Sequence, residues 1–185
     1  MSKKQQTKNQ TATEAFVKKE YPHENFISDT VQYQSINEYT KAIIIPENVK
    51  IAESRIPINA NTRDILIKEL KQAEILAKIG NSVYLIPEHP KYKERLKDAV
   101  VNGALYEFRT ISGNAETLEW HFKFIKKKKG IDTNIFFNIT GNISKNDANK
   151  RFGKILRKHP EYSGKIIMSF EDGRTIYFLD SNDLR

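Results

Sequence analysis

The stretch Asp98-Ala-Val-Val-Asn-Gly-Ala-Leu-Tyr-Glu-Phe-Arg109 decides how this chain of 185 residues is interpreted. Its central dipeptide, Asn102-Gly103, separates two short apolar runs. Such a dipeptide is typical of a two-residue hairpin loop, because both residues of that loop adopt positive φ. With this loop, the register places Asp98 opposite Glu107, and Arg109 projects from the same face as Glu107. The pattern therefore predicts two carboxylates side by side with a guanidinium next to them.

The opposed carboxylates of Asp98 and Glu107 need an explanation, because like charges directly opposite each other destabilise a sheet. A fold keeps such a pair when both groups are exposed to solvent, when one is protonated, or when a divalent cation lies between them. The third interpretation predicts a nuclease-like metal site. The first, two solvated carboxylates at an open hairpin end, stays an alternative.

The positive charge of the chain is concentrated in one stretch. The net charge is +8, and residues 121–165 hold twelve Lys and Arg against three Asp and Glu. A basic surface that follows an acidic hairpin suits a polyanion held against a metal; a solvated helix face with a lysine-rich end is the alternative. The residues expected to bind nucleic acid are Lys126, Lys127, Lys128, Lys129, Lys150, Arg151, Lys154, Arg157 and Lys158.

Composition excludes several classes of protein. The chain has no cysteine, so it has neither disulfides nor thiolate metal sites, and it fits a reducing compartment. No apolar run approaches the roughly 20 residues of a transmembrane helix, and no apolar segment follows the basic N-terminus. We therefore expect a cytoplasmic protein with no signal peptide and no membrane partner.

The composition divides the chain into three parts. Residues 1–12 are polar and are expected to form a disordered tail. Residues 13–61 are expected to form an N-terminal extension that packs partly on the main domain, with a strand near residues 39–45. Residues 62–185 form the main domain.

The main domain is predicted to run helix, strand, strand, strand, helix, strand, helix, strand, strand. Its clearest helices are expected at residues 62–79 and 115–129, and a third helix is expected to begin after Ser144, which can cap it. The strands are expected near residues 82–86, on both sides of Asn102-Gly103, at 134–139, and in a last hairpin that joins 166–170 to 175–179. This order predicts an α/β (α+β) fold with a mixed sheet flanked by helices and a C-terminal β-hairpin.

Three further titratable residues are candidates for a site. Glu69 flanks the apolar stripe of the helix at 62–79 and could reach over the edge of the core. Glu88 directly follows the strand at 82–86, at the strand end where α/β proteins collect functional groups. His121 could shuttle a proton from the helix at 115–129. A surface position, or simple packing for the histidine, is the alternative in each case.

These motifs and their order resemble the PD-(D/E)xK nuclease core, and more closely the C-terminal nuclease toxin domains of contact-dependent growth inhibition proteins, many of which are thought to cleave tRNA. The motifs are Leu76-Ala-Lys-Ile-Gly80, Val83-Tyr-Leu-Ile-Pro-Glu88, Asp98 to Gly103, and Glu107-Phe-Arg109. The resemblance covers about residues 62–180. It implies a restriction-endonuclease-like αβββαβ core that carries an N-terminal extension.

The resemblance implies metal-assisted hydrolysis of phosphodiester bonds. Asp98 and Glu107 would hold Mg²⁺ or Mn²⁺, together with the backbone carbonyl of Phe108. Glu69 or Glu88 would complete the acidic cluster or position the water.

Arg109 is the main departure from the family pattern, which has Lys at this position to orient the attacking water and to stabilise developing negative charge. Arginine can stabilise charge, but it stays protonated and its planar fork is larger. A smaller departure is Lys97, where the family has proline. The residue change at Arg109 puts the activity in question, so a second class of function stays open beside the nuclease.

The first function is a nuclease that acts on nucleic acid, with RNA or tRNA favoured over DNA, and that is toxin-like or associated with mobile elements. The second is a non-catalytic nucleic-acid-binding protein on the same fold. The third is a protein-interaction module that uses the N-terminal extension. A cognate immunity or accessory protein is the protein partner that fits the toxin interpretation, whereas a chain that starts at Met without a delivery domain favours a resident cytoplasmic factor.

Overall fold

The computed structural model describes residues 2–87, 97–170 and 176–179, and it forms two compact units, residues 1–105 and 106–185. Unit 1 contains α1 (Lys3–Glu20), β1 (Phe26–Ile27), α2 (Thr30–Gln34), β2 (Val49–Ala52), the 3₁₀ turn η1 (Glu53–Arg55), α3 (Ala60–Lys78), β3 (Val83–Leu85) and β4 (Ala99–Val101). Strand β5 (Ala104–Ile111) begins at the end of unit 1. Unit 2 continues with α4 (Ala115–Lys129), β6 (Asn134–Ile139), α5 (Lys145–Lys158), β7 (Ile166–Phe170) and β8 (Ile176–Leu179). The division of the chain into domains, with residues 62–185 as the main domain, stays a prediction.

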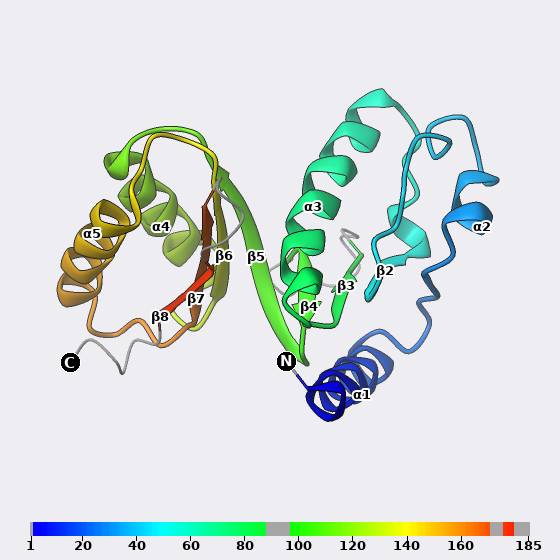
Figure 1. Ribbon diagram of the computed structural model, residues 1–185, viewed down its shortest axis with the longest axis horizontal. Coiled ribbons are helices and arrows are strands. Elements are labelled where there is room, and N and C mark those ends of the chain that lie inside the picture. Colours follow the sequence, from blue (N-terminus) through cyan, green and yellow to red (C-terminus); the bar gives the residue numbers. More distant parts are fainter. Residues whose placement is uncertain (1, 88–96, 171–175, 180–185) are drawn as a thin grey trace. The chain divides into compact units, whose positions relative to one another are not determined.

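Unit 1 is a mixed sheet between helices. Strand β1 pairs antiparallel with β2, β2 pairs parallel with β3, and β3 pairs antiparallel with β4. On one face, Val17 of α1 forms a buried cluster with Tyr84, Ile86 and Val100. Because successive residues of a strand point to opposite faces, the neighbours of Tyr84 point away from α1. Helix α3 packs along β2 and β3 and covers that second face (Figure 1).

Helix α1 takes up most of the stretch for which the composition predicts a disordered tail. The hydroxyl of Ser2 accepts a hydrogen bond from the backbone N of Gln5 and caps the helix. The buried residues of α1 are Asn9, Thr13 and Val17, and the Asn9 side chain donates to the backbone oxygen of Gly80 at 3.4 Å. A helix that buries mainly polar residues has no apolar periodicity, so the sequence pattern does not reveal it.

The prediction of a strand near residues 39–45 is wrong: this stretch forms turns and irregular backbone. Ile43 and Ile45 are buried and Ile44 is exposed, so the alternation of a strand is present without strand pairing. The strand lies after the proline instead, as β2. The apolar run before the proline therefore forms a packed loop, although its burial alternates as it would in a strand.

The predicted hairpin turn is confirmed by the backbone. Asn102 and Gly103 have φ angles of 50° and 84°, the left-handed values that a two-residue hairpin loop needs. The Asn102 side chain accepts a hydrogen bond from the backbone N of Ser82 at 3.0 Å and donates to Asn81 at 2.6 Å. A Cβ at Gly103 would lie 3.2 Å from the backbone oxygen of Ala12 in α1, so this position also needs a residue without a side chain.

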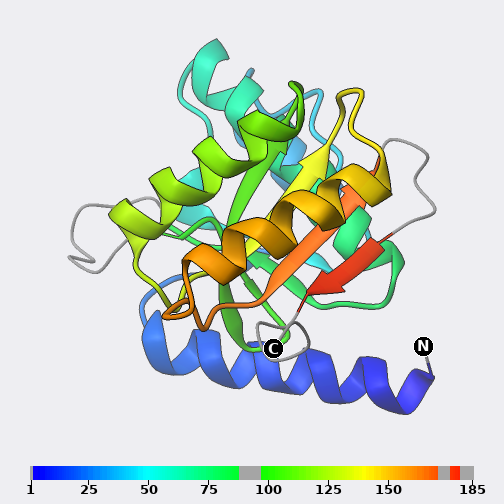
Figure 2. The ribbon, with the colours of Figure 1, turned by 90° about the vertical axis from the view of Figure 1, so that its left-hand side faces the viewer.

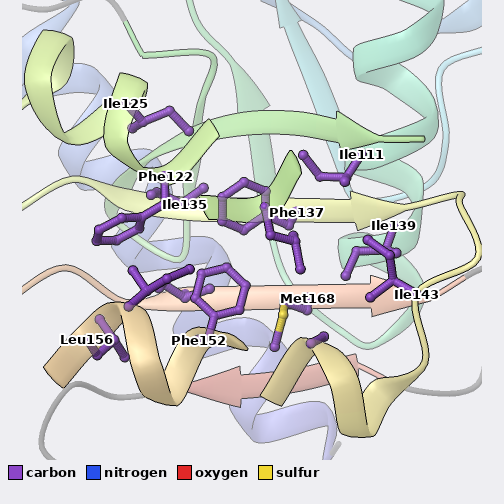
Figure 3. Close-up of a cluster of buried hydrophobic side chains, with 14 of the residues drawn as sticks. Ile111, Phe122, Ile125, Ile135, Phe137, Ile139, Ile143, Phe152, Leu156 and Met168 are labelled. Atoms are coloured by element: carbon purple, nitrogen blue, oxygen red, sulfur yellow. The ribbon is translucent and has the colours of Figure 1, made fainter. Parts of the chain in front are cut away.

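The strands of unit 2 also pair in mixed directions. Strand β5 pairs parallel with β6, β6 pairs parallel with β7, and β7 pairs antiparallel with β8. Helices α4 and α5 lie side by side on one face of this sheet, as Figures 1 and 2 show. Figure 3 shows the core between the helices and the strands, which includes Ile111, Phe122, Ile125, Ile135, Phe137, Ile139, Ile143, Phe152, Leu156 and Met168.

The predicted fold class is confirmed, because the strands form a mixed sheet with helices packed on it. The helix at 115–129 and the strands at 134–139 and 166–170 have the predicted bounds. Within the described ranges, no helix combines the length and the apolar character that crossing a membrane requires.

Candidate catalytic cluster and nucleic-acid interface

The residues that the sequence singles out for catalysis are divided between the two units. Glu69 and Asp98 belong to unit 1, whereas Glu107 and Arg109 belong to unit 2. Glu88 lies outside the described residues. The candidate residues therefore form two clusters, each defined by the contacts within its own unit.

In unit 1, the centre of the cluster is Arg55, a residue that sequence reasoning missed. Its side chain is 4% exposed and forms an ion pair with Glu69, whose side chain is 12% exposed. Its other terminal nitrogen donates to the backbone oxygen of Asp98 at 3.2 Å. Arg55 ends η1, so it joins the segment after β2 to α3 and to the start of β4. The carboxylate of Glu69 is thus mostly enclosed and is paired with an arginine.

In unit 2, the centre is Glu107. Its side chain is 1% exposed and accepts a hydrogen bond from Arg109, and the Lys129 ammonium lies 3.3 Å from its second oxygen. Two cations offset the cost of burying this carboxylate. Arg109 also donates to the backbone oxygen of Phe108 at 2.9 Å, the same carbonyl that the resemblance names as a metal ligand.

The strand register explains why a helix residue can reach this cluster. Glu107 is the partner of Ile135 and Arg109 is the partner of Phe137 in the pairing of β5 with β6. Paired residues share a face, and Ile135 and Phe137 belong to the core beneath α4 and α5. Glu107 and Arg109 therefore point to the helical side of the sheet, where Lys129 reaches Glu107 from the last turn of α4.

The four lysines at the end of α4 do not share one environment. The Lys126 ammonium lies 2.7 Å from Glu161 and 2.8 Å from Nδ1 of His159. Lys129, one turn later on the same side, pairs with Glu107. Lys127 and Lys128 are exposed. The helical period therefore separates two lysines with partners inside the unit from two that face solvent.

Helix α5 contributes the remaining cations of the predicted nucleic-acid surface. Lys150, Lys154 and Arg157 are exposed on its outward side. The other two contact Glu119 of α4, Arg151 at 3.3 Å and Lys158 at 3.8 Å. We call this outward layer of α4 and α5 the basic helical face; it consists of Lys123, Lys127, Lys128, Lys150, Lys154, Arg157 and Lys158.

Glu119 is an acidic residue that contacts cations of that layer. Its hydrogen bond with Lys123 lowers the pKa of its carboxyl, and the charges of Lys158 and Arg151 act in the same direction. Glu119 therefore carries a negative charge at neutral pH and ties the two helices together. The positive charge predicted for this stretch remains on the outward side around it.

A metal site is not complete within the described residues. Among residues 2–87, 97–170 and 176–179, no three His, Asp or Glu side chains form a group that could hold a metal ion. Glu107 offers the oxygen ligands that Mg²⁺ prefers, but two cations already contact its carboxylate. The described residues of unit 2 therefore do not by themselves supply a metal site, and Asp98 remains the second ligand predicted from the sequence.

No protein-family model and no curated protein matches the sequence. Among solved structures, the chain matches one described as "CdiA-CT/CdiI toxin and immunity complex from Burkholderia pseudomallei", with a TM-score of 0.51 and 22% sequence identity. The match covers 67% of this chain and 91% of the other.

The two chains share a fold. At this identity the likeness extends to the fold alone, and it agrees with the resemblance drawn from the motifs between residues 62 and 180. The PD-(D/E)xK assignment, the site residues and the metal stay predictions.

Proposed function

We propose that this chain is a toxin-like nuclease that hydrolyses phosphodiester bonds in RNA, with tRNA as the favoured substrate. The observation that carries the proposal is the buried Glu107 with Arg109 and Lys129, because it lies on the same side of its sheet as the basic helical face. A buried carboxylate held by cations is a candidate functional group, and the basic helical face is suited to phosphates. The matched structure is a toxin and immunity complex, so the proposal includes a cognate protein partner.

In this proposal each residue has a defined task. Arg109, whose side chain is 31% exposed, binds phosphate oxygens with its planar fork while Glu107 and the Phe108 carbonyl hold the guanidinium in place. Lys129 adds a second positive charge at the same carboxylate. The basic helical face holds the backbone of the substrate.

The proposal also includes Mg²⁺ or Mn²⁺, with Asp98 and Glu107 as its ligands. It rests on the register that the two-residue turn at Asn102-Gly103 predicts, and on the suitability of carboxylates for hard cations. When bound, such an ion polarises the phosphoryl oxygen and lowers the pKa of a bound water.

A specific observation favours a second function. Both oxygens of Glu107 have a cation beside them, and one of these cations is the arginine that replaces the lysine of the resembled family. A carboxylate held in this way suits a protein that binds nucleic acid without cleaving it. Such a protein would show steep salt dependence of binding and no metal-dependent cleavage.

The first test is cleavage of tRNA and DNA with Mg²⁺, with Mn²⁺ and with EDTA. We expect the wild-type protein and the control variant Asp64→Ala to cleave tRNA with metal, and EDTA or Asp98→Ala to abolish cleavage. Asp64 is an exposed carboxylate on α3, so its removal tests the loss of one charge alone. Binding that weakens as salt rises, without any cleavage, would refute the nuclease and support the second function.

The variant Arg109→Lys separates the two functions further. It restores the residue of the family pattern, and Lys can release a proton where Arg cannot. We expect the cleavage rate to rise about tenfold, the size of one modest catalytic interaction. A variant that binds RNA as tightly as the wild type and still does not cleave would mark a fold that has lost its chemistry.

A further inference from the structure

The outward side of α4 carries an exposed aromatic pair. Trp120, the single tryptophan of the chain, is 60% exposed. Its ring stacks on Phe124, one turn later, with a centroid distance of 5.5 Å and an angle of 17° between the planes. The apolar side of the same helix, with Leu118, Phe122 and Ile125, is fully buried. The core therefore does not account for Trp120, which lies on the opposite side of the helix.

Cations surround this aromatic pair. The Lys128 ammonium lies 5.0 Å from the centre of the Phe124 ring, within the range of a cation–π interaction. Lys123 and Lys127 are exposed, and a helical rotation of 100° per residue places them on the outward side with Trp120. We call Trp120, Phe124, Lys123, Lys127 and Lys128 the α4 platform. Single exposed apolar side chains are common on proteins, but a stacked pair among lysines has a specific chemistry.

One further residue of α4, His121, lies beside the α4 platform. The His121 ring meets the Trp120 ring edge to face at 4.8 Å. Burial lowers the pKa of His121, and the positive charge of Arg109 lowers it further. His121 thus contacts the Trp120 ring of the platform, and the charge of Arg109 acts on its imidazole.

We propose that the α4 platform stacks on an unpaired nucleobase of an RNA strand, while its lysines bind the adjacent phosphates. Flat aromatic rings among cations are how proteins bind single-stranded nucleic acid, because every base has a stacking face and every linkage has a charge. The bases of a duplex already stack on one another and are not available. This inference deepens the proposed function, on which its choice of RNA rests, and it narrows the substrate to loops and single strands.

The single tryptophan makes this proposal directly measurable. Its fluorescence is recorded during titration, in EDTA, with a single-stranded RNA of about 12 nucleotides whose 2′-hydroxyls are methylated so that it resists cleavage; this length falls within the usual site sizes of single-strand binding proteins. The comparison probes are a duplex of the same sequence and an oligomer without bases. We expect quenching by the single strand alone. Binding of the single strand without quenching, or equal quenching by the duplex, would overturn the proposal.

Variants give a second measurement through the anisotropy of labelled RNA. Trp120→Ala should weaken binding of the single strand by roughly 5- to 150-fold, the usual cost of losing one stacked aromatic. Replacing Lys127 and Lys128 with Gln should lower the slope of log affinity against log salt by about 0.7 for each phosphate that the protein no longer neutralises. The matched control is Ile58→Ala, an exposed apolar residue of unit 1, which should change neither quantity. A Trp120→Ala variant that binds as tightly as the control would exclude stacking.

The outcomes separate this inference from the proposed function. Cleavage of tRNA without quenching by any probe would overturn the platform and leave the nuclease standing. Quenching by the single strand without cleavage would support the platform and refute the nuclease. If no RNA probe quenches but a purified protein partner does, the platform is a protein-binding surface and the proposal is wrong.

Discussion

Each unit of this protein pairs an enclosed glutamate with an arginine. The two pairs differ in which partner is the more exposed to solvent. In unit 1 the arginine is the more buried partner: the side chain of Arg55 is 4% exposed and that of Glu69 is 12% exposed. In unit 2 the carboxylate is enclosed, with Glu107 at 1%, and Arg109 is 31% exposed. The first pair encloses its cation, whereas the second presents its cation to solvent.

This difference separates a structural pair from a candidate site. Arg55 directs its donors to Glu69 and to the backbone of Asp98, so it links parts of unit 1. Arg109 donates hydrogen bonds to Glu107 and to the Phe108 carbonyl, and its side chain is still partly exposed to solvent. A guanidinium that is fixed at one end and solvated at the other can bind an anion without losing much side-chain freedom.

The largest expected effect is that of Arg55→Ala. Removing the guanidinium takes the Arg55 partner from the Glu69 carboxylate, which is 12% exposed, and breaking an enclosed ion pair costs about 3–5 kcal/mol. Urea denaturation should show this decrease in the free energy of unfolding. The control is Arg63→Ala, which removes an exposed partner of Asp64 and should change stability by no more than about 0.5 kcal/mol. Equal effects of the two variants would mean that the burial of Arg55 does not decide its contribution.

The second prediction concerns Glu107→Gln, which keeps the volume of the side chain and removes its charge. We expect a smaller loss of stability, about 1–3 kcal/mol, because Arg109 and Lys129 are partly exposed and can regain water. Cleavage should be lost in the same variant. The two stabilities are measured in one set of urea titrations, and a loss as large as that of Arg55→Ala would contradict the contrast between the two pairs.

The smallest expected effect is the pH dependence that His121 introduces. Its folded pKa lies below 6.5, through burial first and the charge of Arg109 second. The unfolded chain therefore takes up this proton at a higher pH than the folded protein does. Stability contributed by the neutral imidazole is complete above pH 6.5 and falls as the pH decreases through the folded pKa.

The measurement is the difference in unfolding free energy between wild type and His121→Gln, followed from about pH 7.5 down to about pH 5, since the unperturbed pKa of histidine is about 6.5. The carboxylates titrate in both proteins, so the difference isolates His121. A wild type that loses no more stability than the variant over this range would show that Arg109 and burial do not act on the imidazole.

The sequence predicted the parts of the fold where local chemistry and periodicity agree. Asn102-Gly103 forms the hairpin turn because few residues accept two positive φ angles in succession. The helix that ends in four lysines has its predicted bounds because Asn114 caps it, an apolar stripe runs along it and Gly130 follows it. These signals lie within a few residues of one another, so no knowledge of distant contacts is needed.

Other features have no local signal. Helix α1 buries Asn9 and Thr13, which have the composition of a polar tail. Arg55 carries no motif, and its role exists only because Glu69 and the Asp98 carbonyl lie within its reach. The division of the lysine run between Glu107, Glu161 and solvent likewise depends on which residues lie beneath the helix.

Sequence information was therefore sufficient for the order of helices and strands in residues 62–179, for the hairpin turn, and for the placement of positive charge on two consecutive helices. Turn chemistry, capping and helical period are properties of neighbouring residues, which is why these features are visible in the chain. The pairing of the charges required the folded protein. The burial of Glu107, its two cations and the exposure of Trp120 follow from strand register and from the side on which α4 packs, and those depend on residues far apart in the chain.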